Sequence, residues 1–396
     1  MNTFAFIIQT PFTNRDYKRF GVDLLLNRGI SVDVLDLTKL INPKYLDLYK
    51  VEDKSLYKNI YQISSVEQFE SYVKNNSEVI YINFIHGNPK TYFVYRIYKK
   101  YNSVYASFTA NALPAFTKII KEPKLKKISK IFNFQILKEI ISSRLFKLAD
   151  KLEIIQKPAF VLAGGDAKTN YLPTPTKKSK IIYAHTLDYD LYLEYLRKNN
   201  SKDSSPKYAV FLDEYLPLHP DFIVIGDRFK PYKNNPELYF NEMRYIFDAI
   251  EKEIKMPIVI AAHPRAKYKD TDKFYGEREI VNGRTIELVA GSNIVLLHCS
   301  TSINFSVLFK KPMVFILPKG LKGGFYDDQI SGFSRLFGVN PYSGNNSPEI
   351  SNYIARFGKA YEEYKQKYIK TKNSPDKYFW EIVSDEIILR DKKWEM

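Results

Sequence analysis

The sequence predicts an α/β fold made of two Rossmann-like domains that face each other across a cleft. Three observations support this prediction. The chain has 396 residues, more than a single hydrophobic core usually supports. Hydrophobic residues make up 45% of it, which excludes a disordered chain. Short apolar runs alternate with longer amphipathic segments, as strands and helices do in parallel sheets.

The first half alternates strands and helices from its start. Strands are expected at 4–9, 31–37, 78–85, 104–107, 160–162 and 180–184, and helices at 14–28, 90–100 and 118–156. The polar, Ser-rich segment 200–207 contains Pro206 and is typical of a linker. We therefore expect an N-terminal domain over 1–205 and a C-terminal domain over 206–396.

The alternation begins again after the linker. Strands are expected at 208–212, 257–262, 294–297 and 312–317, and helices at 236–255, 285–290, 303–309, 347–370 and 377–389. The last helix is expected to pack back on the first domain. In open parallel sheets, ligands bind beyond the carboxyl ends of the strands, so the loops that follow strands are where candidate residues are sought.

Charge and cysteine content limit the classes of partner. The formal charge is +16 and the pI about 9.4, but the excess is mostly lysine spread along the chain. Without a helix-turn-helix or zinc-finger pattern, we expect no nucleic-acid partner. The one cysteine, Cys299, excludes an intrachain disulfide and a thiolate metal cluster.

The first residues are typical of a buried strand, so we expect no signal peptide there, and no run of about 20 apolar residues could span a bilayer. We expect a cytoplasmic protein. The basic, amphipathic segment 118–151 suggests peripheral contact with the inner membrane face. The plainer alternative is a core-packed helix with solvated lysines.

The strongest candidate site directly follows the expected strand 257–262. Its residues are His263, Pro264 and Arg265. Proline fixes φ and suits the first turn of a helix, while an imidazole beside a guanidinium suits an anion. The alternative is a structural histidine.

A second candidate follows the expected strand 294–297, where Ser300, Thr301 and Ser302 precede a helix. Hydroxyl groups and free backbone N–H groups at such a position can hold a phosphate, whereas an ordinary N-cap needs only one of them. Glu287, one turn into the expected helix 285–290, could accept both hydroxyls of a ribose. Its plainer interpretation is an acid that complements the helix dipole.

Together these segments resemble the donor half of the GT-B bacterial sialyltransferases and related capsule and lipooligosaccharide transferases, which use CMP-activated nonulosonic acids or Kdo. The similar stretch covers about 60 residues. The resemblance implies that His263 and the Ser300–Ser302 hydroxyls bind the CMP phosphate, that Arg265 adds charge and that Glu287 holds ribose. It also implies a GT-B fold with a glycan or glycolipid acceptor on the first domain and the nucleotide sugar on the second.

The acidic pair followed by glycine that supplies the general base in those enzymes is absent here. Two acids in suitable loops are candidates instead, and we leave the choice open. Asp188 follows the expected strand 180–184, and Asp213, followed by Glu214, ends the strand 208–212. Either could deprotonate an acceptor hydroxyl, or could simply be a helix N-cap or a solvated loop acid.

Asp188-Tyr189-Asp190 also matches the short DxD metal motif of GT-A transferases. The two-half architecture argues against that class, so we expect neither a metal nor a cofactor apart from the sugar nucleotide. A second His-Pro dipeptide, His219-Pro220, lies in mid-loop, and we do not assign it to the donor phosphate.

Two alternative functions remain. The first is a GT-B transferase or epimerase that uses a UDP-sugar, because diphosphates are also bound by histidine and serine in two-domain Rossmann sites. The second, from another class, is a non-catalytic glycan- or nucleotide-binding protein.

Overall fold

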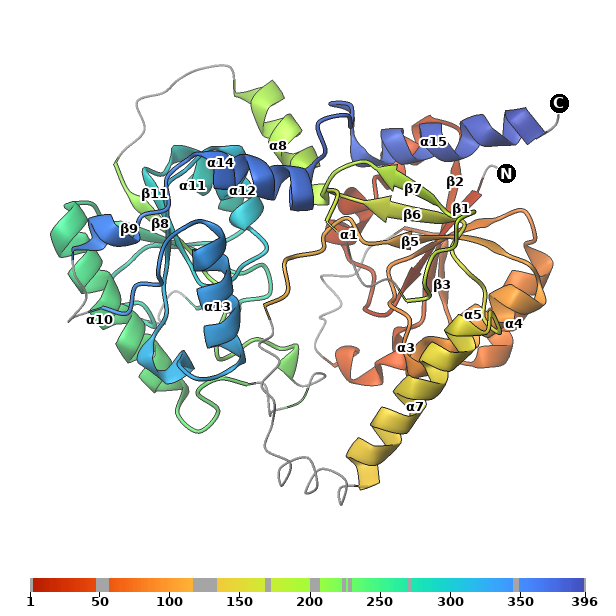
Figure 1. Cartoon of the computed structure of the whole chain (residues 1–396), viewed down its shortest axis with the longest axis horizontal. Coiled ribbons are helices and arrows are strands. Elements are labelled where there is room, and N and C mark those ends of the chain that lie inside the picture. Colours follow the sequence, from red (N-terminus) through yellow and green to blue (C-terminus); the bar gives the residue numbers. More distant parts are fainter. Residues whose placement is uncertain are drawn as a thin grey trace. The chain divides into compact units, whose positions relative to one another are not determined.

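The computed structural model describes residues 3–47, 57–116, 134–167, 172–199, 207–222, 226, 230–269, 273–344 and 349–394. The chain forms two compact units, each with its own parallel sheet (Figure 1). The first unit comprises 1–112, 119–185 and 373–396, and the second comprises 113–118 and 186–372.

The first unit contains a seven-stranded sheet in the order β3-β2-β1-β4-β5-β6-β7, and every pair is parallel. Its strands are β1 (Thr3–Ile8), β2 (Ser31–Asp36), β3 (Ile60–Gln62), β4 (Ile80–Asn83), β5 (Val104–Phe108), β6 (Phe160–Ala163) and β7 (Lys180–Tyr183). Its helices are α1 (Asn14–Arg19), α2 (Val22–Asn27), α3 (Thr38–Ile41), α4 (Val66–Asn75), α5 (Tyr92–Lys100), α7 (Phe134–Lys151) and α15 (Phe379–Trp394). Strands buried on both faces form continuous apolar runs, as β1 and β6 do.

The predicted helix 14–28 is two helices, α1 and α2, divided at Gly21. Thr13 begins α1 with a capping box, in which its hydroxyl oxygen accepts from Asp16 N and the Asp16 carboxylate accepts from Thr13 N. Gly21 has φ +56°, and a Cβ at this position would lie 2.7 Å from a ring carbon of Trp380 in α15. Only glycine allows both the left-handed turn and this close approach.

The second unit contains a five-stranded parallel sheet in the order β10-β9-β8-β11-β12. Its strands are β8 (Ala209–Leu212), β9 (Ile258–Ala261), β10 (Ile280–Val281), β11 (Ile294–Leu297) and β12 (Met313–Phe315). Its helices are α8 (Leu187–Lys198), α10 (Pro236–Ile254), α11 (Thr285–Gly291), α12 (Ile303–Leu308), α13 (Phe325–Leu336) and α14 (Lys359–Tyr364).

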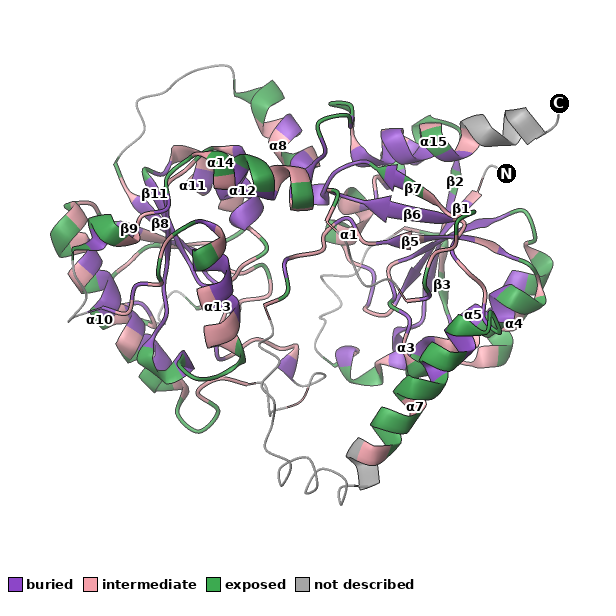
Figure 2. Cartoon of the chain, in the orientation of Figure 1, coloured by how far each residue is buried: buried purple, intermediate pink, exposed green. Residues whose placement is uncertain are grey.

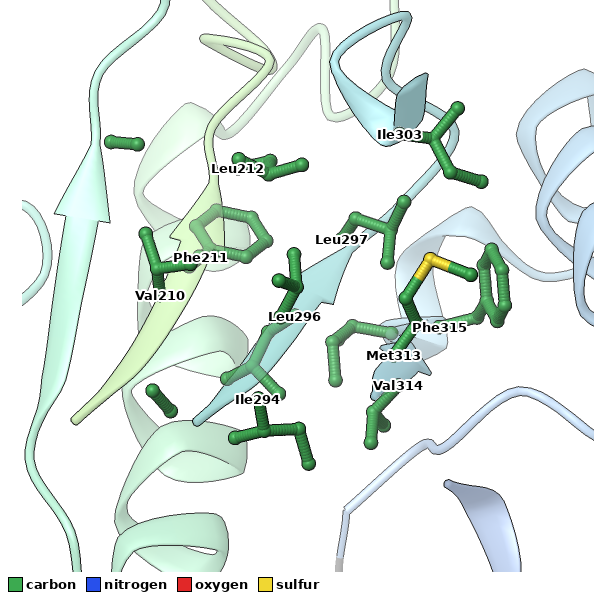
Figure 3. Packing of buried hydrophobic residues seen from close by; sticks show 14 of the residues in the cluster. Val210, Phe211, Leu212, Ile294, Leu296, Leu297, Ile303, Met313, Val314 and Phe315 are labelled. Carbon is green, nitrogen blue, oxygen red and sulfur yellow. The ribbon is translucent and has the colours of Figure 1, made fainter. Parts of the chain in front are cut away.

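The core of the second unit is built on its three adjacent strands β8, β11 and β12. Phe211, Leu296 and Val314 are paired in register across these strands and so share one face of the sheet, and Ile303 from α12 belongs to the same core (Figure 3). All of these residues are buried, and the strands are drawn as buried along most of their length in Figure 2. This packing fixes the strand ends, and so it also fixes the loops that leave them.

The two units meet in the sequence at His185 and Thr186, about twenty residues before the predicted boundary at 205. Helix α8 belongs to the second unit because its start is tied to that unit. Thr186 N donates to Ile369 O at 2.8 Å, and Asn304 of α12 donates to Asp188 at 2.9 Å. Residues 200–206 of the predicted linker lie outside the described residues. Helix α15 belongs to the first unit, in which Trp380 packs on Phe6.

Two predicted helices are shorter than expected. In the segment 118–156 the described helix is α7, which ends at Lys151; residues 117–133 lie outside the described part, and Glu153 has φ +54°. The prediction of a single helix over 347–370 is wrong. Ala355 forms an antiparallel bridge with Met313, so the chain is extended there, and α14 begins only after Gly358.

The periodicity of the sequence also left β3, β10, α3, α4, α8 and α13 unpredicted. Asp188, which we expected in a loop, lies in helix α8. None of the helices in the described part of the chain combines the length and the apolar character needed to cross a bilayer.

Candidate functional site

Three loops of the second unit begin at the carboxyl-terminal end of its sheet. Strands β9, β8 and β11 are neighbours and parallel, so their carboxyl ends meet. Asp213 directly follows β8, His298 directly follows β11, and His263 lies two residues after the end of β9. The expected phosphate-binding segments therefore lie on either side of the loop that carries Asp213 and Glu214.

Asp213 is 3% exposed, and its carboxylate accepts four hydrogen bonds. Oδ1 accepts from Tyr215 N and from the Tyr275 hydroxyl, each at 2.8 Å. Oδ2 accepts from the Tyr268 hydroxyl at 2.9 Å and from His263 N at 3.3 Å. Burial raises the pKa of Asp213, and these hydrogen bonds oppose part of the rise. Its carboxylate thus holds the backbone of the loop that begins at His263.

Glu214 holds the other neighbouring loop. Its Oε1 accepts from Cys299 N at 2.7 Å, one residue before Ser300. Loss of solvation, with a smaller contribution from the Asp213 charge, raises the pKa of this carboxyl to about 7, against the lowering effect of the hydrogen bonds from Cys299. Two consecutive acids at the end of the central strand therefore brace the loops at the ends of both flanking strands.

His263, Pro264 and Arg265 form a tight turn. Proline occupies the second position, and Ala266 N donates to His263 O at 2.8 Å. The imidazole takes part in the turn, because its Nδ1 accepts from Arg265 N at 3.1 Å. The structure thus fixes the orientation of the His263 ring relative to its own backbone.

His219-Pro220, which we did not assign to the donor phosphate, has the same pattern of hydrogen bonds and lies beside this turn. Phe222 N donates to His219 O at 3.3 Å, and Asp221 N donates to His219 Nδ1 at 3.1 Å. The centres of the His219 and His263 rings are 4.7 Å apart, and the ring planes are inclined at 71°. The third residues of the two turns, Asp221 and Arg265, form an ion pair at 2.5 Å. The signal in the sequence was the repeated dipeptide itself.

Ser300, Thr301 and Ser302 lie between β11 and α12. Ser300 Oγ accepts from Ser302 N at 3.2 Å, and Ser300 O accepts from Ile303 N at 3.2 Å. Thr301 is exposed, and Ser302 makes no side-chain cap of α12. The hydroxyl-bearing segment is thus a turn held at its start by Glu214 and at its end by the helix.

His298, which precedes this turn, has a structural role. It is fully buried, and its Nδ1–H donates to Ile316 O at 2.6 Å while Nε2 accepts from the Tyr239 hydroxyl at 3.0 Å. Burial lowers the pKa of His298 to about 4, so the ring is neutral at physiological pH.

The remaining predicted site residues lie on helices of the same unit. Glu287 is exposed in the first turn of α11, the helix that follows β10. Asp188 lies in the first turn of α8 and accepts from Asn304 Nδ2 at 2.9 Å. Asn304 is buried at the start of α12, directly after the Ser300–Ser302 turn. Both residues of the DxD motif belong to the same helical turn of α8.

No protein-family model and no curated protein matches the sequence. Among solved structures, a variant of the wall teichoic acid polymerase TagF matches with a TM-score of 0.52 and 12% identity, over 100% of this chain and 90% of the other. CalG4, the calicheamicin glycosyltransferase, matches with a TM-score of 0.50 and 10% identity, over 98% of each chain. A UDP-GlcNAc 2-epimerase from Methanocaldococcus jannaschii has a TM-score of 0.48 at 14% identity, over 99% of each chain.

These likenesses extend over nearly the whole chain and agree with two units that each contain a parallel sheet. The chain has the GT-B fold. At such low identity the likeness defines the fold alone, so the function has to be argued from the site.

Proposed function

We propose that the protein is a GT-B glycosyltransferase whose second unit binds a nucleotide-sugar donor. One observation carries the proposal: Asp213 and Glu214, consecutive at the end of β8, hold on either side a His-Pro turn and a Ser-Thr-Ser turn. Both turns present groups that bind oxyanions, and both lie where ligands bind to open parallel sheets. Because the two carboxylates brace these turns before a ligand arrives, the site needs little rearrangement on binding.

Within this site His263 and the Ser300–Ser302 turn would hold the phosphate of the donor and stabilise the nucleotide as it leaves. Arg265, paired with Asp221, would add positive charge near that phosphate. Glu287 would accept the hydroxyls of the ribose. These residues lie in or after the loops that follow strands β10, β9 and β11 of the sheet.

The nucleotide of the donor is the finer question. The partial sequence resemblance favours CMP linked to a nonulosonic acid or Kdo. None of the three solved structures reported above is a sialyltransferase, and the broader alternative of a UDP-sugar-dependent transferase or epimerase agrees better with them. We therefore place a UDP-sugar first and a CMP-sugar second. A binding protein without activity is disfavoured by the carboxyl of raised pKa beside the Ser300 turn.

Two acids are candidates for the base that deprotonates the acceptor. Asp188 is partly exposed and has the Asn304 amide as its partner. Glu214 has a pKa of about 7, which suits proton transfer at neutral pH. Asp213, which the sequence offered as the alternative to Asp188, already accepts four hydrogen bonds, and we propose it as a positioning residue instead.

The first unit would hold a glycan or glycolipid acceptor. Helix α7 would attach this unit to the inner face of a membrane. Ile141, Leu145, Leu148 and Leu152 lie along one helical face and are 48% to 60% exposed. Exposed basic residues flank them: Lys138, Arg144, Lys147 and Lys151. Figure 2 shows most of α7 as exposed. An apolar stripe between basic side chains fits an anionic lipid surface.

A thermal-shift experiment with UDP, CMP and GDP tests the donor site. We expect stabilisation by one pyrimidine nucleotide, with UDP favoured, and loss of that effect in His263→Ala and Ser300→Ala. Lys252→Ala, on the exposed side of α10, is the matched control and should respond as the wild type does. Stabilisation by none of the nucleotides, or an unchanged response in both site variants, would overturn the proposal. Product analysis with the matching sugar nucleotide then separates transfer from epimerisation.

A further inference from the structure

The two His-Pro turns determine which nitrogen of each imidazole carries the proton. In both turns a backbone N–H donates to Nδ1, so Nδ1 must present its lone pair. A neutral imidazole then keeps its single proton on Nε2. His219 and His263 are thus held as the same tautomer, and each has a hydrogen-bond donor at Nε2.

The turns are also held to each other. The rings meet edge to face at 4.7 Å between centres, and the Asp221–Arg265 ion pair joins the ends of the turns. The His219 side chain is 15% exposed, and burial lowers its pKa despite the opposing charge of Asp221. Two neutral rings can share this space without the repulsion that two imidazolium ions would experience.

The spacing allows both rings to reach one ligand group. An imidazole nitrogen lies about 1.2 Å from the ring centre, so the two Nε2 atoms are at most about 7 Å apart. Two oxygens of a phosphate, about 2.5 Å apart, can accept from donors separated by up to about 8 Å when each hydrogen bond is about 2.9 Å long. Both Nε2 atoms are therefore within reach of one phosphate group when their N–H groups point to the same side of the ring pair.

We infer that His219 binds the substrate together with His263, and that the two form a pair of neutral Nε2–H donors for a single oxyanion. His219 thus contacts the ligand directly, and the His219-Pro220 turn forms part of the binding site. The oxyanion is a phosphate of the nucleotide or the carboxylate of an acidic sugar. This choice of ligand rests on the proposed function, whereas the tautomers and the pairing of the rings do not.

Two substitutions at position 219 separate the role of His219 as a hydrogen-bond donor to the ligand from its role in holding the turn. Asparagine places an amide oxygen where Nδ1 is, so His219→Asn keeps the acceptor for Asp221 N and removes the Nε2 donor. His219→Gln places an amide N–H near the Nε2 position. We expect the Asn variant to bind the active nucleotide about 10- to 100-fold more weakly, as loss of a hydrogen bond to a charged group implies, and the Gln variant to recover most of the affinity. His86→Asn, at an exposed histidine of the first unit, is the control and should bind as the wild type does.

Calorimetric titration with UDP or CMP, and separately with N-acetylneuraminic acid, identifies the oxyanion. Weaker binding of the free nucleotide by His219→Asn assigns the pair to phosphate, and weaker binding only of the acidic sugar assigns it to the carboxylate. Unchanged affinity for both overturns the inference, while the proposed function stands on its His263→Ala response.

¹⁵N NMR of the histidine rings provides a test that needs no nucleotide. Each of the five histidines can be assigned by substitution. We expect Nε2–H tautomers at His219 and His263, an Nδ1–H tautomer at His298, and a joint shift of the first two on addition of inorganic phosphate. If no nucleotide binds but this joint shift occurs, the proposed function fails and the inference stands. A protonated Nδ1 at His219, or a shift at His263 alone, would overturn the inference.

Discussion

Replacement of Asp213 by asparagine separates the two roles that an acid at this position could have. The carboxylate accepts from two backbone N–H groups, those of Tyr215 and His263, and from two tyrosine hydroxyls. In Asp213→Asn one oxygen becomes an NH₂ group, so one backbone N–H and one hydroxyl face another donor. The hydroxyl can rotate away, but the backbone N–H cannot.

The cost can be estimated from these contacts. A buried N–H without an acceptor costs about 1–3 kcal/mol, and the loss of charge weakens each remaining hydrogen bond by up to about 1 kcal/mol. We therefore expect Asp213→Asn to lower the free energy of unfolding by about 2–5 kcal/mol. Because the His263 turn loses its brace, nucleotide affinity should fall by about 10-fold or more.

Urea denaturation followed by circular dichroism measures the change. Tryptophan fluorescence is an internal control, because both tryptophans, Trp380 and Trp394, lie in α15 of the first unit. We expect Asp213→Asn to lower the urea midpoint of the transition followed by ellipticity and to leave the midpoint of the transition followed by fluorescence almost unchanged. Asp248→Asn, at a 70% exposed carboxylate paired with Arg278, should change stability by less than about 0.5 kcal/mol.

A different result would refute the bracing role. If Asp213→Asn keeps its stability and nucleotide affinity but loses sugar transfer, then Asp213 is the general base and its hydrogen bonds are incidental.

Three further predictions follow from other parts of the structure. The pKa of Glu214 is raised from 4.5 to about 7 in the folded protein, so its contribution to stability is present below pH 4.5 and is lost as the pH rises through 7. Over this range we expect Glu214→Gln to become more stable relative to the wild type in urea melts. Equal pH dependence of the two proteins would contradict this prediction. Gly21→Ala should destabilise the first unit by about 1–3 kcal/mol in tryptophan-fluorescence melts, because the new Cβ meets Trp380 at 2.7 Å and φ is positive; an unchanged midpoint would be inconsistent with the observed packing. Leu145→Glu should abolish sedimentation with anionic phosphatidylglycerol vesicles and leave the melting temperature unchanged, whereas retained sedimentation would exclude the exposed stripe of α7 as the membrane contact.

Most strands of both units could be predicted from the sequence, because a strand buried on both faces forms a continuous apolar run. Strands at 4–9, 160–162 and 294–297 were found in this way. Elements with one exposed face, such as α13, or with few residues, such as β3, carry a weaker signal and were missed. The break at Gly21 depends on Trp380, which is hundreds of residues away in the sequence.

The loops that carry the candidate residues could also be predicted, because in open parallel sheets ligands bind beyond the carboxyl ends of the strands. The partners of each side chain could not. Asp213 meets tyrosines that lie 55 and 62 residues further on, and nothing in its immediate sequence distinguishes such a brace from a catalytic base. His219 was set aside because its loop does not directly follow a strand. The ring contact with His263 is a tertiary contact, and only the repetition of His-Pro hinted at it.

A crystal structure of the protein with the pyrimidine nucleotide that stabilises it most would test directly whether the second unit holds the donor phosphate. We predict phosphate oxygens within about 3 Å of His263 Nε2 and of a hydroxyl or backbone N–H in the Ser300–Ser302 turn, as hydrogen bonding requires. A nucleotide bound elsewhere on the chain, with both turns unoccupied, would contradict the proposed donor site.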